Sequence, residues 1–333
     1  MSFYTNVCRY GNTVLYRGYN HEAKRIYKRD NEFKPVFFVP SKEESQWKSL
    51  DGHNIAPIQM DNMRHAKEWL TANKNVAGRE VYGNHKYLQQ YITQKFPRDI
   101  KFRREFIDVG TFDIETEYED GFPEPAEASQ RILSITYKSS KSKLYHVWGY
   151  GDFDIEKSLI QPVRYYRCRD ESSLLTKFLS FWSDPDKTPD VVTGWNVGFF
   201  DISNLINRTS GILGVDACKA FSPWRMIDQR EITRRGKSAI AYDIKGIEQL
   251  DYLELFQKFG YSYGAQESYA LNHIAYVVLG ERKLSFEEAG SLKNLYKSDF
   301  QKYIDYNMKD VELVDRIEEK MGLIDLALTL AYD

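Results

Sequence analysis

Three acidic side chains alternate along one short stretch, TFDIETEY, at residues 111–118. Asp113, Glu115 and Glu117 stand at every second position, so in a strand they project from one face while the apolar side chains between them face the other way. Two carboxylates 4 Å apart repel by roughly 4 kcal/mol at an effective dielectric constant near 20. Either this strand end lies in water, or the acids are gathered to bind a cation, for which oxygen ligands suit Mg²⁺ or Mn²⁺.

A second acidic position follows a predicted turn in TGWNVGFFDISNLINR, residues 193–208. A short buried strand ends there, a tight loop carries Asn196, and a helix is predicted to begin near Phe200 and Asp201. An Asp in the first turn of a helix is stabilised in its charged form by the helix dipole, which keeps it available as a metal ligand. The purely structural alternative is that Asp201 caps the helix and Asn196 forms the turn.

A third pattern lies on a predicted amphipathic helix, YIDYNMKDVELVDRI, residues 303–317. Tyr306 and Asp310 are four residues apart, so a phenol and a carboxylate share one face of the helix. In isolation this pair is more typical of a half-buried Tyr beside a solvated Asp than of a functional site.

Taken together, the three patterns favour a metal-dependent site over three unrelated structural features. Four acids can hold two divalent ions about 3.5–4 Å apart, one of which generates hydroxide from water while the other stabilises the leaving oxygen of a phosphodiester. A Tyr hydroxyl can orient the attacking water, because that role needs a hydrogen-bond partner rather than a base of neutral pKa.

Composition limits the class of protein without fixing its function. The chain has 333 residues, is 42% hydrophobic and 15% aromatic, and has a net charge of −2, which argues against disorder and against a surface coated with positive charge. The three cysteines are scattered, and no apolar run is long enough to span a membrane. We therefore expect a cytoplasmic protein without a membrane partner. Basic residues gather at 95–104 and 225–245, where nucleic acid or merely solvent could lie.

The order of predicted elements indicates two domains. Short strands separated by turns fill the first forty residues, and helical patterns follow at 61–73 and 86–96. From residue 105, three strands in a row lead into alternating helices and strands, which indicates a mixed α/β sheet covered by helices. We place the boundary at about residue 104.

At this point the chain resembles a known family. FDIET, TGWNVGFFD and YNMKD, in that order, resemble the Exo I, Exo II and Exo III motifs of DEDDy-type 3′–5′ proofreading exonucleases. The resemblance is strongest to the exonuclease half of family B DNA polymerases of T-even-like bacteriophages. DGFPEP (120–125), FSPWRM (221–226) and LDYLELFQKF (250–259) match as well, and the resemblance covers nearly the whole chain.

The resemblance implies a fold and a set of site residues. The expected fold is α/β: an RNase H-like exonuclease domain at 105–315, with a mixed central sheet flanked by helices, and a smaller β-rich α+β N-terminal domain at 1–104. A C-terminal helix at 316–333 is expected either to pack on the N-terminal domain or to be the place where a polymerase subunit docks. Two ions, Mg²⁺ or Mn²⁺, are expected on Asp113, Glu115, Asp201 and Asp310, with Tyr306 positioning the water. Expected DNA-binding residues are Phe122, Asn196, Phe200, and Arg234 and Arg235 near the tip of a β-hairpin at 226–244.

The chain departs from the family in one respect. It contains neither a D-x-x-S-L-Y-P-S nor a Y-G-D-T-D-S motif, so we expect it not to extend DNA by itself. We expect a proofreading 3′–5′ exonuclease acting on single-stranded DNA or a frayed primer 3′ terminus in the cytoplasm of an infected bacterium. A separate polypeptide would carry the polymerase domain; the initial Met and the absence of a tag favour a natural subunit over a shortened form of a longer polymerase.

Two alternatives stay open on the sequence alone. One is a free-standing exonuclease that trims RNA or DNA without a polymerase. The other is a structural or nucleic-acid-binding subunit that completes a polymerase partner and has little or no catalytic activity. Its N-terminal domain would bind RNA through the aromatic-rich first strands and the basic stretch 95–104.

Overall fold

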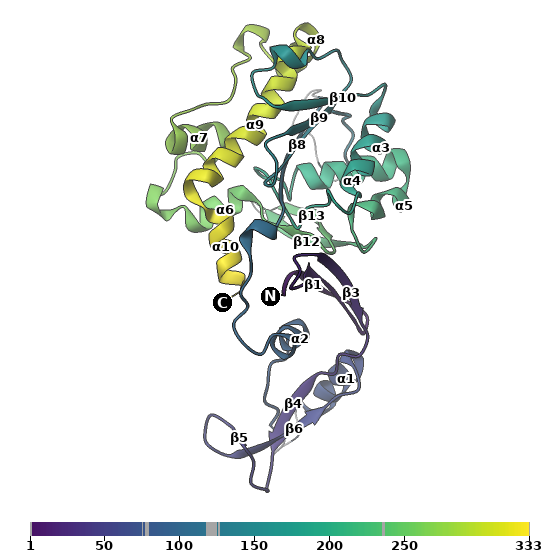
Figure 1. Ribbon diagram of the computed structural model, residues 1–333, viewed down its shortest axis with the longest axis vertical. Coiled ribbons are helices and arrows are strands. Elements are labelled where there is room, and N and C mark those ends of the chain that lie inside the picture. Colours follow the sequence, from purple (N-terminus) through teal and green to yellow (C-terminus); the bar gives the residue numbers. More distant parts are fainter. Residues whose placement is uncertain are drawn as a thin grey trace. The chain divides into compact units, whose positions relative to one another are not determined.

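The structure, a computed structural model, divides the chain into two compact units, Met1–Phe102 with Tyr332–Asp333, and Arg103–Ala331 (Figure 1). It describes residues 2–74, 76, 80–117, 125, 127–234 and 237–332, with only the backbone of 233, 234 and 237–239. Each unit has hydrophobic clusters of its own. In the described ranges, no helix has both the length and the apolar character that crossing a membrane requires.

Two small antiparallel sheets form most of the first unit. One has the order β1-β2-β3 and the other β4-β6-β5. The elements are β1 (Phe3–Tyr10), β2 (Thr13–Tyr19), β3 (Arg25–Asp30), β4 (Val36–Pro40), β5 (Trp47–Lys48), β6 (Asn54–Gln59), α1 (Met63–Asn73) and α2 (Tyr87–Lys95). Asn62 caps α1 by accepting hydrogen bonds from two backbone N–H groups of its first turn.

A six-stranded mixed sheet forms the centre of the second unit, in the order β10-β9-β8-β7-β11-β14. Its strands are β7 (Val109–Thr116), β8 (Ile132–Ser139), β9 (Tyr145–Gly149), β10 (Val163–Arg167), β11 (Val191–Thr193) and β14 (Glu248–Gln249). Strands β7, β8 and β9 form an antiparallel meander, whereas β10, β11 and β14 pair in parallel with their neighbours. The strand that carries the alternating acids is therefore central in the sheet.

Helices cover both faces of this sheet (Figure 1). Phe112 and Ile114 of β7 face a cluster shared with α3 (Glu171–Trp182) and α4 (Asp201–Leu213). The opposite face packs against α9 (Phe300–Met321), through residues such as Val147 and Ile304. Because side chains alternate along a strand, Asp113 and Glu115 project toward α9.

The remaining elements complete the second unit. They are α5 (Val215–Cys218), the antiparallel hairpin β12 (Ile227–Arg234) and β13 (Lys237–Ile244), α6 (Tyr252–Phe259), α7 (Leu271–Leu279), α8 (Leu292–Ser298) and α10 (Leu323–Tyr332). The α/β fold expected from the sequence, a mixed sheet flanked by helices with a smaller β-rich unit, is confirmed.

The C-terminal helical segment differs from the expectation of one helix at 316–333. Gly322 has a left-handed φ of 63°, which glycine adopts without steric cost and which ends α9 at Met321. Residues 316–321 thus belong to the helix of the Exo III motif, and α10 is a separate element. The second compact unit of the structure runs to Ala331, so it includes nearly all of α10.

Candidate active site

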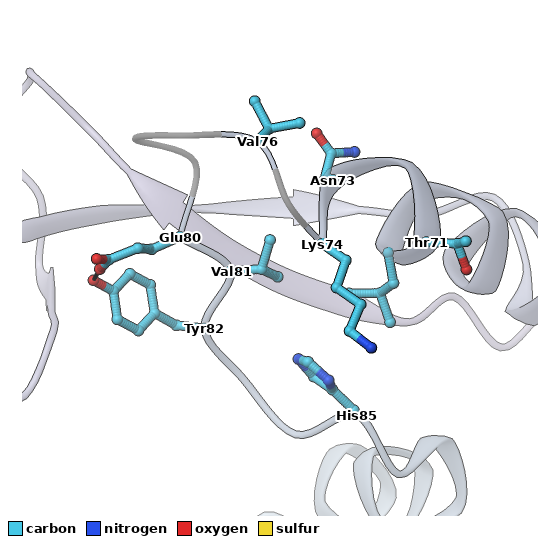
Figure 2. Close-up of a pocket in the computed structure, with 9 residues that line it drawn as sticks. Thr71, Asn73, Lys74, Val76, Glu80, Val81, Tyr82 and His85 are labelled. Carbon is cyan, nitrogen blue, oxygen red and sulfur yellow. Dashed lines mark hydrogen bonds between the residues drawn. The ribbon is translucent and has the colours of Figure 1, made fainter.

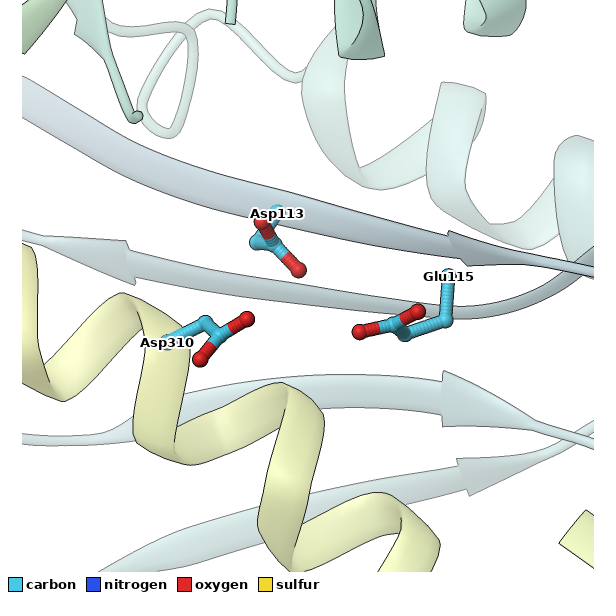
Figure 3. Close-up of side chains that lie close together, drawn as sticks. All are labelled: Asp113, Glu115 and Asp310. Atoms are coloured by element: carbon cyan, nitrogen blue, oxygen red, sulfur yellow. The ribbon is translucent and has the colours of Figure 1, made fainter. Parts of the chain in front are cut away.

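Three carboxylates from two elements meet on the α9 face of the sheet (Figure 3). Asp113 and Glu115 come from β7, and Asp310 comes from α9. Each offers one oxygen, and these oxygens all lie within 4.8 Å of one another. Residues that stand about 200 positions apart in the sequence therefore form one acidic cluster, which has the oxygen-rich character that Mg²⁺ and Mn²⁺ require.

Asn307 fixes the position of Asp113. Its Nδ2 donates a hydrogen bond of 2.7 Å to Asp113 Oδ2, while its Oδ1 accepts bonds from Ser134 and Thr136 of β8, at 3.1 and 2.7 Å. The two hydroxyl donors fix which end of the amide faces the carboxylate. Sequence reasoning missed this residue, although its place one turn before Asp310 on the same helix would have indicated it.

Asp201 lies beside the cluster but is not one of its three members. It is the first residue of α4, is 2% exposed, and its Oδ1 accepts a 2.9 Å hydrogen bond from the backbone N–H of Ile114. That bond joins the start of α4 to the strand between Asp113 and Glu115. The expected fourth ligand is thus adjacent to the cluster, with one of its oxygens engaged by β7.

The turn before α4 is built by Asp251, a residue that sequence reasoning also missed. Its carboxylate accepts hydrogen bonds from the backbone N–H groups of Asn196 (3.0 Å) and Gly198 (3.2 Å). These bonds hold Asn196 at a left-handed φ of 68°, a conformation that Asn tolerates better than most residues. The side-chain Oδ1 of Asn196 is buried and accepts no hydrogen bond from the described residues, whereas Phe200 is half-buried against the core.

Tyr306 is held between an aromatic ring and an ammonium group. Its ring meets that of Phe286 edge-on at 5.6 Å, and Lys283 Nζ lies 3.5 Å from its hydroxyl. The same Nζ lies 2.5 Å from Asp310 Oδ2. Lys283 comes from the segment after α7, and no periodicity or motif in its sequence, GERKLSF, indicated a role. Asp310 Oδ1, the other oxygen of that carboxylate, is buried and has no hydrogen-bond partner in the described ranges.

Burial makes the charged forms of these acids costly. It is the main cause that raises the pKa of Asp113 far above its ordinary range, and the negative charges of Asp201, Asp310 and Glu115 raise it further. Burial, followed by the charge of Asp310, raises the pKa of Glu115 to about 8. Burial also raises the pKa of Asp201 and of Asp310, the latter against the opposing effect of Lys283.

Burial and the neighbouring acids have opposing effects on the pKa of Lys283. Burial lowers the pKa of Lys283, but the acidic groups around it, Asp310 above all, outweigh burial and raise that pKa above its ordinary value. One ammonium group therefore stays charged among several carboxylates and offsets only part of their repulsion. A divalent ion would offset the remaining repulsion: the donors are all oxygens, and one oxygen of Asp310 is buried with no hydrogen-bond partner among the described residues.

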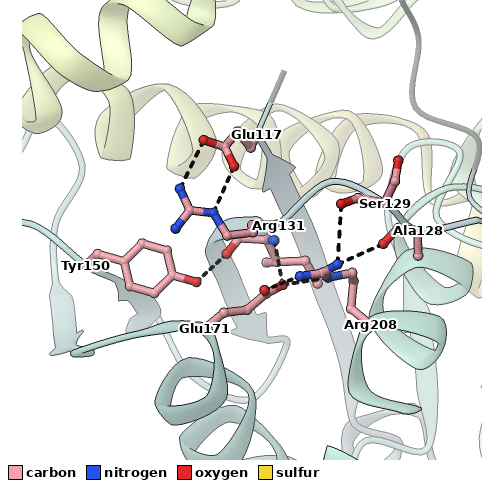
Figure 4. Close-up of polar contacts among 8 residues, drawn as sticks. Glu117, Ala128, Ser129, Arg131, Tyr150, Glu171 and Arg208 are labelled. Atoms are coloured by element: carbon pink, nitrogen blue, oxygen red, sulfur yellow. Dashed lines mark hydrogen bonds and ion pairs between the residues drawn. The ribbon is translucent and has the colours of Figure 1, made fainter. Parts of the chain in front are cut away.

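The third acid of the alternating stretch has a different partner. Both carboxylate oxygens of Glu117 accept hydrogen bonds from Arg131, at 2.8 and 3.0 Å (Figure 4). Phe122 and Arg235 lie outside the described residues, and Arg234 is described only by its backbone in β12. The expected roles of these last three residues in DNA binding stay predictions.

One cavity lies in the first unit, away from the acidic cluster. It has a volume of about 610 Å³ and lies between the end of α1 and the segment at 80–85, with Lys74 and His85 facing into it (Figure 2). Glu80 is the only acid among its described lining residues. The chemistry-bearing groups are therefore in the second unit.

Comparison with known proteins gives one matching family and several sequence relatives. The sequence model of the DNA polymerase family B exonuclease domain matches residues 58–274, which include Asp113, Glu115 and Asp201. The DNA-directed DNA polymerases of Enterobacteria phage T4 and Escherichia phage RB69 are each 30% identical to 99% of the chain. The DNA polymerase delta catalytic subunit of Candida albicans is 29% identical over 63% of it. The chain spans 38% of the length of the two phage polymerases and 20% of the yeast subunit.

Proposed function

Because this chain belongs to the exonuclease-domain family of family B DNA polymerases, we propose that it is a metal-dependent 3′–5′ exonuclease that acts on single-stranded or frayed DNA ends. The observation that carries the proposal is the cluster of Asp113, Glu115 and Asp310, whose oxygens lie within 4.8 Å of one another. Asp201, bonded to the strand between the first two, supplies the fourth carboxylate of the motif set.

We assign two divalent ions, Mg²⁺ or Mn²⁺, to these four carboxylates. When bound, such ions supply a nucleophile from water near neutral pH and offset the charge that develops on a phosphodiester. The chain contributes by holding its ligands in place: Asn307 orients Asp113 through a 2.7 Å bond, and α4 positions Asp201. Preorganised ligands need no rearrangement at the moment of reaction.

Tyr306 is assigned to orient the attacking water. Burial and the charge of Asp310 raise the pKa of its phenol above the ordinary value, so it is protonated at neutral pH and can donate a hydrogen bond. The ammonium group of Lys283, 3.5 Å from that hydroxyl, restricts where it points. A buried donor with a fixed direction suits positioning rather than proton abstraction.

The polarity of hydrolysis tests the assignment. We expect a 5′-labelled single-stranded oligonucleotide to shorten one nucleotide at a time in Mg²⁺, and not in EDTA, while a 3′-labelled strand loses its label as a mononucleotide. Release of the 5′ end first, or internal cleavage, would exclude a 3′–5′ exonuclease. Faster hydrolysis of a matched RNA strand would favour the free-standing RNA-trimming enzyme instead.

We also propose that this exonuclease edits for a polymerase active site carried outside the present sequence. The phage relatives are polymerases by name, and the chain spans 38% of their length. The site would receive primer ends that the polymerase has mispaired. Co-purification from infected cells tests this proposal: we expect a polypeptide with the polymerase motifs in the eluate, and its absence at stoichiometric yield would contradict the proposal.

A further inference from the structure

A second, smaller cavity lies immediately beyond the acidic cluster on the same face of the sheet. It has a volume of about 120 Å³, and its lining includes Thr116, Glu117 and Tyr303. Thr116 and Glu117 directly follow Glu115 at the end of β7, and Tyr303 precedes Asn307 by one turn of α9. The cavity is therefore adjacent to the carboxylates along both elements that carry them.

Cations predominate around this cavity. Among its described lining residues, the charged ones are Arg131, Lys293, Lys297 and the acid Glu117, so these four groups carry a formal charge of +2. The two lysines are four residues apart on α8 and share one face of that helix. Glu117 uses the Nε and one Nη2 hydrogen of Arg131, which leaves the Nη1 side of the guanidinium without a hydrogen bond in the described chain.

The two lysines are available to bind a ligand. Within the described part of the chain, neither Lys293 nor Lys297 takes part in an ion pair or side-chain hydrogen bond, although both are exposed. Tyr296, between them, and Tyr303 give the cavity an aromatic wall. Two uncommitted ammonium groups and a guanidinium around a small hollow match the groups that bind phosphate in protein–DNA contacts.

We propose that Arg131, Lys293 and Lys297 form a phosphate-binding subsite for the DNA strand, one that holds an internucleotide phosphate beside the scissile bond. The inference rests on the proposed exonuclease function and extends it. The cavity's volume of about 120 Å³ is enough to take a phosphate group. A cluster of carboxylates repels a polyanionic strand, and a cationic subsite next to it offsets that repulsion at the point where the strand must be held.

The test is the double variant Lys293→Gln/Lys297→Gln, assayed on a single-stranded oligonucleotide over a range of salt concentrations in Mg²⁺. We expect a higher KM with kcat unchanged. The slope of log KM against log salt should fall by about 0.7, because each phosphate contact to a single strand contributes roughly that amount and the two lysines hold the same phosphate. Lys143→Gln/Lys258→Gln, which neutralises two exposed lysines of the same unit, serves as the control and should leave the slope unchanged.

Each result assigns or overturns the subsite. A KM and salt slope equal to those of the control variant, with normal hydrolysis, would overturn the subsite and leave the exonuclease intact. A wild-type protein that releases no nucleotide would instead refute the proposed function. Weaker inhibition of the variant by dAMP, with the KM for the strand unchanged, would overturn the strand assignment and give the site to the released nucleotide.

Discussion

Lys283 and Asp310 show how single residues balance the charge of the cluster. The ammonium group lies 2.5 Å from one carboxylate oxygen, and the Lys283 side chain is only 26% exposed. Replacing it leaves Asp310 without its cation in a buried setting, and breaking such a pair typically costs several kcal/mol. The pair is therefore expected to matter more than the many ion pairs on the surface.

We predict that Lys283→Met destabilises the metal-free protein by about 2 kcal/mol, measured by urea unfolding in EDTA. Mg²⁺ should recover more stability in this variant than in the wild type, because a bound cation takes over the missing charge. Lys302→Met serves as the control, because it breaks the Lys302–Glu288 ion pair, which is more exposed than the Lys283–Asp310 pair. It should change stability by less than about 1 kcal/mol. Equal losses in both variants would contradict the charge-balancing role.

The raised pKa values of the acids predict how metal and pH act together. The folded protein keeps a proton on Glu115 up to its pKa of about 8, whereas the unfolded chain releases it near its ordinary value. Between these values the folded state binds more protons, so stability is highest below the lower pKa and falls as pH rises toward 8.

We therefore predict that the rise in Tm caused by saturating Mg²⁺ is small at pH 5 and large at pH 8. In EDTA, Glu115→Gln should lose less Tm between these pH values than the wild type does, because one of the titrating groups is gone. Thermal scans at both pH values measure the difference. Parallel losses in the two proteins would show that Glu115 is not a source of the pH dependence.

Sequence reasoning found the residues that carry acids in patterned positions, because strand alternation and helical spacing are local properties. Asp113, Glu115 and Asp310 do come together in the structure, while their catalytic roles stay predictions. Sequence reasoning did not identify Lys283 and Asp251, because each lies in a connecting segment that only the tertiary fold brings to the site.

At the scale of elements, the position of α4 depends on how closely β11 approaches β7. A Cβ atom on Gly194, just after β11, would lie 2.5 Å from the backbone oxygen of Phe112 and so cannot be accommodated without movement. The turn that follows leads directly into Asp201. Gly211, inside α4, has open space around its Cβ position and no positive φ.

This pair gives a matched test with opposite signs. We predict that Gly194→Ala destabilises the protein by about 1–3 kcal/mol and weakens its response to Mg²⁺, because Asp201 shifts relative to β7. Gly211→Ala should stabilise it by about 0.5–1 kcal/mol, since alanine favours a helix interior. Chemical unfolding with and without Mg²⁺ distinguishes them; destabilisation by both variants would contradict the close approach at Gly194.

Most elements were predicted from local sequence signals. The strands that were missed were missed for physical reasons. The long helices and the β7–β9 meander were predicted because their apolar periodicity is sustained. Strand β10 was missed: it lies at the sheet edge, pairs only with β9, and has a run of polar and aromatic residues without clean alternation. Strands β5 and β14 have two residues each, too few to show any period.

At the scale of the molecule, every described member of the candidate site belongs to the second unit. The acids, Asn307, Tyr306 and Lys283 all lie within Arg103–Ala331, which also contains the six-stranded sheet and the clusters on both its faces. A unit that has its own core and contains all four proposed metal ligands is expected to fold and bind metal by itself.

We predict that a fragment comprising residues 103–331 folds cooperatively and shows the same Mg²⁺-dependent rise in Tm at pH 8 as the full chain. Circular dichroism and thermal scans would measure both properties. A fragment that is folded but unresponsive to Mg²⁺ would place part of the metal site in the first unit, and the full chain provides the reference.

The central claim, that the acidic cluster is a hydrolytic metal centre, is tested most directly by Asp113→Ala/Glu115→Ala. Mg²⁺-dependent release of 3′ nucleotides from a labelled single strand would be measured beside Asp186→Ala/Glu319→Ala, which removes two exposed acids of the same unit. We predict that the first variant stays folded and loses nucleotide release, while the control keeps it. Undiminished Mg²⁺-dependent release by a folded Asp113→Ala/Glu115→Ala protein would contradict the claim.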